Sequence, residues 1–145
     1  MKDKFKETLS SVLSYLLKVE RRTLLWTNSN PDANFAPQTI LNNGQLDGFD
    51  AVEIWSSFLG LNSPIYPTKV LMGTSGSLAF QNLETTTATN ASTFINGVAR
   101  TVTVNASGIT FGNGQMTYNG GAYVNWQSRA IPYKIYGIKS GGGTA

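Results

Sequence analysis

The stretch from Arg129 to Lys139 limits most strongly what this chain can fold into. From Ile131 onward, β-branched and aromatic residues recur with a period of two, which is typical of a strand. The alternation predicts two sides, Ile131, Tyr133 and Ile135 on one and Lys134, Tyr136 and Ile138 on the other. Pro132 has no amide hydrogen to donate, so we expect it near the start of the strand. A C-terminal strand must pair with strands that precede it in the sequence. We therefore expect the rest of the domain to consist of strands.

Turn residues divide the body of the sequence into short strand-like segments. Only 13% of the 145 residues are charged, against about a quarter in ordinary soluble domains, and Gly, Asn, Ser and Thr fill the difference. We expect strands near residues 23–27, 35–41, 51–58, 68–72, 77–83, 98–104, 109–111, 115–118, 123–126 and 131–139, with 84–96 as a loop and Gly112–Gly114 as a turn. Arg100 interrupts an inward row of valines and is expected at the rim.

These segments predict an all-β fold, a β-sandwich of jelly-roll-like form preceded by an N-terminal amphipathic α-helix. The expected units are a helix over 1–22, the β-sandwich domain over 23–139 and a flexible tail over 140–145.

Five apolar residues define a stripe on the expected helix. Their spacing of 4, 3, 4 and 3 residues is the a/d rhythm of a coiled coil: Phe5, Leu9, Val12, Leu16 and Val19. A helix this short is marginal alone in water, so the stripe needs a partner. Three interpretations are open. The helix packs on its own β body, it bundles with other copies of the chain as an oligomerisation or attachment segment, or it lies on a membrane surface.

The composition excludes several kinds of chemistry. The chain has no Cys and no His, so it cannot build a disulfide, a thiolate site or a Ser-His-Asp device. The net charge of +3 comes from residues 1–22, which hold six basic and three acidic residues, while the remainder is balanced at five of each. A nucleic-acid binder would need a basic face on the body. No apolar run reaches the roughly 18 residues of a membrane span, and we see no signal peptide.

Asp47, Asp50 and Glu53 form the main acidic group. Three carboxylates close together could hold Ca²⁺, and two could serve in glycoside hydrolysis. Turn chemistry is the favoured interpretation, because Asp47 and Asp50 suit turn positions and Glu53 is an outward residue of the next strand. We therefore expect no metal site, no catalytic residue and no cofactor.

Aromatic and amide side chains alternate late in the chain: Tyr118, Asn119, Tyr123, Asn125 and Trp126. Aromatic faces stack on sugar rings, and amides bond to hydroxyl groups, so this group is a candidate receptor or glycan contact. The favoured alternative is that Tyr123 and Trp126 lie in the core or between subunits.

Five segments in this order resemble a class of structural proteins from tailed bacteriophages and prophages. The segments are LWTNSNP (25–31), FAPQTI (35–40), GFDAVEI (48–54), RTVTV (100–104) with GITF (108–111), and IPYKIYGIK (131–139). Members of this class are small proteins or C-terminal domains of tail fibres, receptor-binding proteins and other virion components. The resemblance spans about residues 22–139 and implies a virion protein.

The expected function is that of a non-enzymatic tail-fibre or receptor-binding head, assembled as a homotrimer through its helix and contacting a host surface glycan or receptor. The alternative is a capsid decoration protein, or head fibre, that the helix attaches to other proteins of the particle. No nucleic-acid partner and no membrane insertion are expected. A polysaccharide depolymerase is a weaker third possibility.

Overall fold

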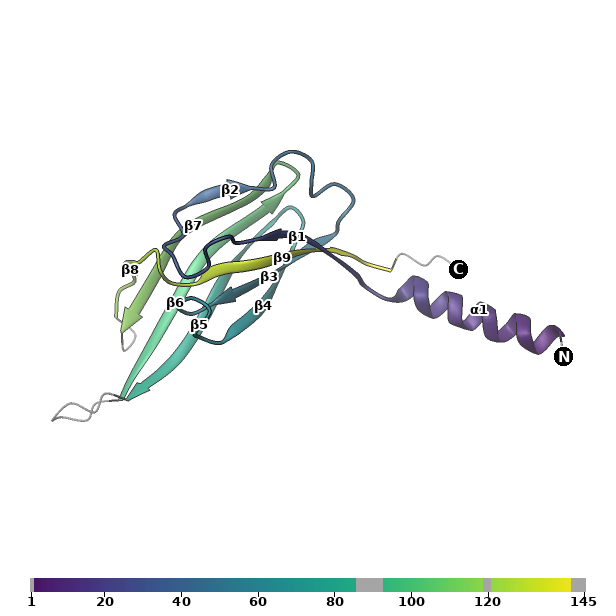
Figure 1. Cartoon of the computed structure of the whole chain (residues 1–145), viewed down its shortest axis with the longest axis horizontal. Coiled ribbons are helices and arrows are strands. Elements are labelled where there is room, and N and C mark those ends of the chain that lie inside the picture. The colour runs from purple at the N-terminus through teal and green to yellow at the C-terminus, as the bar shows by residue number, and fades with distance from the viewer. Residues whose placement is uncertain (1, 86–92, 119–120, 142–145) are drawn as a thin grey trace.

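The computed structural model describes residues 2–85, 93–118 and 121–141 of the chain. Figure 1 shows a body of strands with one helix projecting from one end. The elements are α1 (Lys2–Lys18), β1 (Arg21–Thr27), β2 (Gln38–Ile40), β3 (Ala51–Ser57), β4 (Ile65–Leu71), β5 (Thr74–Thr85), β6 (Thr93–Asn105), β7 (Gly108–Tyr118), β8 (Val124–Asn125) and β9 (Ile131–Lys139). The prediction of an N-terminal helix followed by a β body is confirmed.

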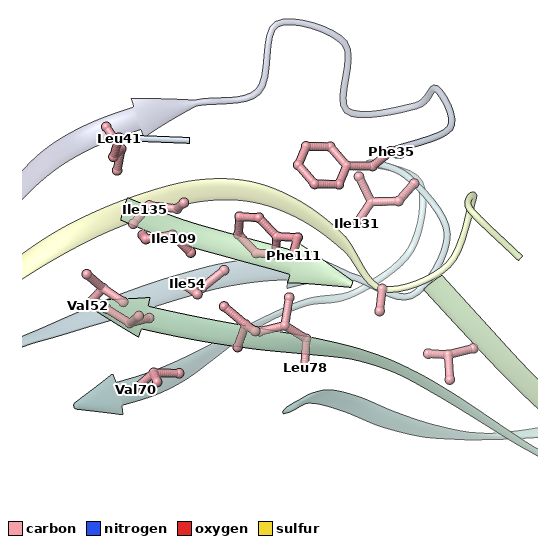
Figure 2. Close-up of a cluster of buried hydrophobic side chains, with 14 of the residues drawn as sticks. Phe35, Leu41, Val52, Ile54, Val70, Leu78, Ile109, Phe111, Ile131 and Ile135 are labelled. Atoms are coloured by element: carbon pink, nitrogen blue, oxygen red, sulfur yellow. The ribbon is translucent and has the colours of Figure 1, made fainter. Parts of the chain in front are cut away.

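The strands form two antiparallel sheets. The first sheet has the order β1-β9-β3-β4, and the second has the order β2-β7-β6-β5, with β8 paired to β7 beside that path. Figure 2 shows apolar side chains from both sheets meeting in one cluster. The cluster includes Val52, Ile54 and Ile135 from the first sheet and Leu78, Ile109 and Phe111 from the second. Burial of this cluster holds the two sheets together.

Strand β3 shows how the sequence pattern becomes packing. Val52 and Ile54 point into the core and are fully buried, whereas Glu53 and Trp55 lie half-buried on the opposite side. This is the predicted alternation, since successive side chains of a strand face opposite sides of the sheet. The outer side of β3 therefore carries a carboxylate and an indole.

The closing strand is central in its sheet. Strand β9 pairs with β1 on one edge and with β3 on the other. This confirms the prediction that the C-terminal strand pairs with strands from much earlier in the sequence.

A bulge in β9 changes the predicted sides of that strand. Lys134 and Pro132 pair with consecutive residues of β3, so Tyr133 has no partner there. The prediction that Tyr133 shares a side with Ile131 and Ile135 is therefore wrong. The two isoleucines lie in the core, while Tyr133 lines an outer pocket.

Two expected loops differ from the structure. Gly112–Gly114 does not end a strand, because β7 continues from Gly108 to Tyr118 and takes up these residues at a register shift opposite β6. The predicted loop 84–96 is also too long, since β5 continues to Thr85 and β6 begins at Thr93, and residues 86–92 lie outside the described ranges. Cross-strand pairing over twelve positions, from Thr74↔Val104 to Thr85↔Thr93, overrides the polar composition here.

The body has two distinct ends. Arg21 pairs with Lys139, so the start of β1 and the finish of β9 lie side by side next to α1. We call this the helix end. Strand β8 and the paired ends of β5 and β6 lie at the opposite end in Figure 1, which we call the far end. At the helix end the Ser140 amide donates to the Asp50 carboxylate at 2.8 Å, so the predicted tail starts from a fixed residue, and 142–145 lie outside the described residues.

Candidate functional site

The predicted oligomerisation residues form an exposed apolar stripe along α1. Phe5 is 70% exposed, and the other four, Leu9, Val12, Leu16 and Val19, are between 40% and 52% exposed. Figure 1 shows the helix pointing away from both sheets. The interpretation in which the helix packs on its own β body is therefore wrong. An association with another molecule remains a prediction.

The helix is shorter than the predicted segment 1–22. It ends at Lys18, and Arg21 and Arg22 belong to β1, because this part of the chain pairs with β9. Arg22 forms an ion pair with Glu53, and its guanidinium lies 4.7 Å from the ring centroid of Tyr136. Arg22 therefore belongs to the body and not to the basic helical segment.

The predicted receptor residues lie at the far end, next to β8. Tyr123 and Trp126 flank this two-residue strand and are 52% and 40% exposed, and Asn125 is exposed as well. They are therefore surface residues in the single chain, not core residues. The backbone of Tyr118 ends β7, but its side chain lies outside the described residues, as does Asn119.

The structure places these side chains on two surfaces. The Asn125 side chain accepts a hydrogen bond from Gln115 at 3.3 Å, and the Tyr123 hydroxyl lies over Gly97, where a Cβ would come within 3.3 Å of it. Trp126 lies instead against Arg129, whose guanidinium is 4.5 Å from a ring centroid of the indole. Alternation along an extended chain accounts for the separation. Tyr123 and Trp126 therefore each offer a separate, small surface for contact with a ligand.

Arg100 anchors the loop that carries Trp126, and the prediction that it sits at the rim is wrong. Its side chain is fully buried, and its guanidinium donates to the backbone carbonyls of four residues. The distances are 2.9 Å to Ala130, 2.7 Å to Gly112, 3.1 Å to Gln127 and 3.1 Å to Arg129. Five N–H donors in a fixed fork suit such a ring of acceptors. The charge is tolerated because every nitrogen has a carbonyl partner.

Burial lowers the pKa of Arg100 to about 10, because desolvation penalises the charged form. The guanidinium still carries its charge at neutral pH. The ring of Phe35 lies 5.2 Å from the guanidinium carbon and adds a cation–π contact.

The three acidic residues Asp47, Asp50 and Glu53 each contact a different part of the body. Glu53 accepts from Arg22 and from the Trp55 indole at 2.7 Å, and Asp50 accepts from the Ser140 amide. Asp47 closes a turn in which its amide donates to the Gly44 carbonyl at 3.1 Å. In the ranges that the structure describes, no group of three or more acidic side chains is placed to hold a metal ion.

Sequence reasoning missed a pocket on the outer side of the first sheet. It is lined by Trp55 of β3, Ile65 of β4, and Tyr133, Lys134 and Tyr136 of β9. The available signal was the outward position of Trp55 beside the aromatic-basic pattern of the closing strand. Nothing in the sequence indicated that a bulge would turn Tyr133 to the same side.

The comparisons with known proteins identify no relative. The chain matches no protein-family model, no curated protein and no solved structure. Within the described residues, α1 is neither long nor apolar enough to cross a membrane.

Proposed function

We propose that this chain is a non-enzymatic virion structural protein, in which α1 gathers copies into a trimer and the β body is displayed to the host cell surface. The exposed apolar stripe on α1 carries the proposal. Burying a fully exposed side chain of this kind contributes about 1.5–3 kcal/mol, and these five are about half covered in the single chain, so they supply on the order of 5 kcal/mol per helix. A lone helix of 17 residues would gain none of this.

The residue types in the stripe favour three or four copies over two. The spacing assigns Leu9 and Leu16 to the a positions and Phe5, Val12 and Val19 to the d positions of a heptad. β-branched residues at d with leucine at a disfavour the parallel dimer, and they shift preference to higher oligomers. Leu13, at the adjacent e position and half exposed, widens the apolar surface that a trimer would bury.

The arrangement of the body supports display. Two of its exposed aromatic side chains, Tyr123 and Trp126, flank β8 at the far end, remote from α1 (Figure 1). A trimer built on the helices would direct the far ends outward, where they could contact a receptor or a glycan. The virion setting rests on the resemblance of residues 22–139 to phage structural proteins.

We also propose that the body is a jelly-roll-like sandwich. The chain passes between the two sheets from β1 to β2, from β2 to β3, from β4 to β5 and again before β9, which is the repeated crossing of Greek-key folds. The consecutive pairing of β5, β6 and β7 is a meander within that plan.

Oligomeric mass tests the proposal. Light scattering on the full chain is expected to give three times the 15.6 kDa of one copy. Leu9→Glu puts three carboxylates into the bundle and should give a monomer with a folded body. Ser10→Glu, one residue away and off the stripe, should remain trimeric. A wild-type chain that stays at 15.6 kDa at high concentration would refute the trimer.

A second candidate is capsid decoration, in which α1 attaches the body to the particle. The first turns of α1 favour it, since Lys2 and Lys6 border an apolar hollow formed by Phe5 and Leu9. Such a surface suits an acidic partner. If Leu9→Glu abolishes attachment to particles while the wild-type chain is a monomer in solution, decoration replaces the trimeric head.

A further inference from the structure

We propose that the outer side of the first sheet binds a carboxylate-bearing sugar, such as a uronic or sialic acid residue. The site is the pocket lined by Trp55, Ile65, Tyr133, Lys134 and Tyr136. It lies on a different surface from Tyr123 and Trp126. The inference concerns the isolated chain and does not depend on the trimer or on the virion setting.

The pocket has the size and lining of a site for one sugar ring. Its volume is about 290 Å³, at the lower limit of the range for small-molecule sites. Three of its five lining residues are aromatic, and all five are half-buried, so part of each side chain is accessible. The C–H face of a pyranose can pack on such rings.

One hydrogen bond and two cation–π contacts hold the Trp55 and Tyr136 walls in place. The Trp55 indole N–H donates to Glu53 at 2.7 Å, and Glu53 is in turn ion-paired with Arg22. The Arg22 guanidinium covers Tyr136 at 4.7 Å and approaches Trp55 at 6.0 Å. The indole and the phenol are therefore oriented before any ligand arrives, which reduces the entropy lost on binding.

The bulge in β9 completes the pocket. Because Tyr133 has no partner on β3, it joins Lys134 and Tyr136 in lining the same cavity. In a regular strand, neighbouring residues such as Tyr133 and Lys134 would face opposite sides. Bulges that redirect a side chain are frequent next to functional sites.

The charge of the pocket selects an acidic ligand. Among the described residues that line it, Lys134 alone is charged, and its ammonium lies 5.1 Å from the Tyr133 ring centroid. In the described part of the chain no carboxylate comes within ion-pair distance of Lys134, whereas Lys69 on the same sheet is paired with Glu20 at 2.9 Å. A carboxylate on the sugar would supply the missing partner.

Across β3 and β9, which supply four of the five lining residues, recognition must come from side chains, and this disfavours a peptide. Strands β3 and β9 are both paired along their two edges, so their backbones cannot take an added strand. An extended acidic peptide would gain only the Lys134 contact, while a sugar ring also covers the aromatic walls.

Titration of the full chain tests the proposal, with methyl glucuronide, sialic acid methyl glycoside and methyl glucoside as probes. Chemical-shift changes in an amide NMR spectrum suit the affinity of about 1 mM expected for one ring. Both acidic sugars should bind more tightly than the neutral one, with shifts at β3 and β9. Lys134→Gln should weaken acidic-sugar binding about 10-fold or more, the loss expected for a charge-assisted hydrogen bond.

Lys69→Gln is the matched control and should change the affinity less than about two-fold, because Lys69 lies outside the pocket. Equal binding of acidic and neutral sugars, unchanged binding by Lys134→Gln, or tighter binding of a glutamate hexapeptide would overturn the proposal. The Leu9→Glu chain should bind the acidic sugars like the wild type, so this test and the trimer test can fail independently.

Discussion

Arg100 shows how a buried residue can fix the position of an exposed side chain, here that of Trp126. Its guanidinium joins β6 to the carbonyls of Gly112, Gln127, Arg129 and Ala130 and so fixes the loop that presents Trp126. Gly114 makes room for it, since a Cβ there would lie 2.6 Å from the Arg100 guanidinium and 2.7 Å from the Arg129 carbonyl. The far-end contact thus depends on a charge inside the body.

Replacing this guanidinium is expected to lower the free energy of unfolding strongly. Arg100→Met keeps much of the volume but leaves buried carbonyls without donors, and we expect it to lower the free energy of unfolding by about 3–5 kcal/mol. Arg22→Met, which breaks an exposed ion pair, should cost about 1 kcal/mol or less. Urea denaturation of both variants measures the difference. Similar losses for the two would contradict the role assigned to Arg100.

The sign of the pH dependence follows from the lowered pKa. Below pH 10 Arg100 is protonated in both the folded and the unfolded chain, so the loss in Arg100→Met should be nearly the same at pH 6 and pH 9. Above about pH 10 the folded chain releases this proton before the unfolded chain does. The contribution of this group to stability then rises with pH until the unfolded chain also releases its proton.

At the scale of elements, α1 and the strands obtain their stability from different sources. The strands bury a shared core, whereas the apolar stripe of α1 is exposed in the single chain. The helix should therefore be stable only when copies associate.

Hydrogen exchange can separate these two sources. Amides of α1 should lose protection when the protein is diluted below the dissociation constant of the trimer, while amides of β3 and β9 keep theirs. In Leu9→Glu the helix should be unprotected at every concentration. Protection of α1 that does not vary with dilution would mean that the helix is stable without a partner.

Local signals in the sequence predicted the elements better than their registers. The spacing of Phe5 and Leu9 and the alternation of Val52 and Ile54 predicted the helix and the buried side of β3, since both periods are set by the local backbone. The bulge at Tyr133 and the burial of Arg100 depend on strands distant in sequence. No window of residues contains that information, which is why the pocket was missed.

At the scale of the whole molecule, α1 and the strand β8 that Tyr123 and Trp126 flank lie at opposite ends (Figure 1). If the far end contacts the receptor, Trp126→Ala should reduce adsorption to host cells about 10-fold or more, because aromatic anchors dominate most interfaces. Leu71→Ala is the control: Leu71 is more exposed than Trp126, at 58% against 40%, but it ends β4 at the helix end, and adsorption should be unchanged. Unchanged adsorption by a folded Trp126→Ala chain would remove the far end as the contact.

The pairing of Arg21 with Lys139 has a practical consequence for anyone modifying this protein. A fluorescent protein or an affinity tag fused after Ser140 would lie at the helix end, beside the C-terminus of α1. It would leave the far end accessible. In the proposed trimer the same fusion would lie close to the helices of the neighbouring copies, so the largest fusion that still permits trimer formation would measure the space around the three helices.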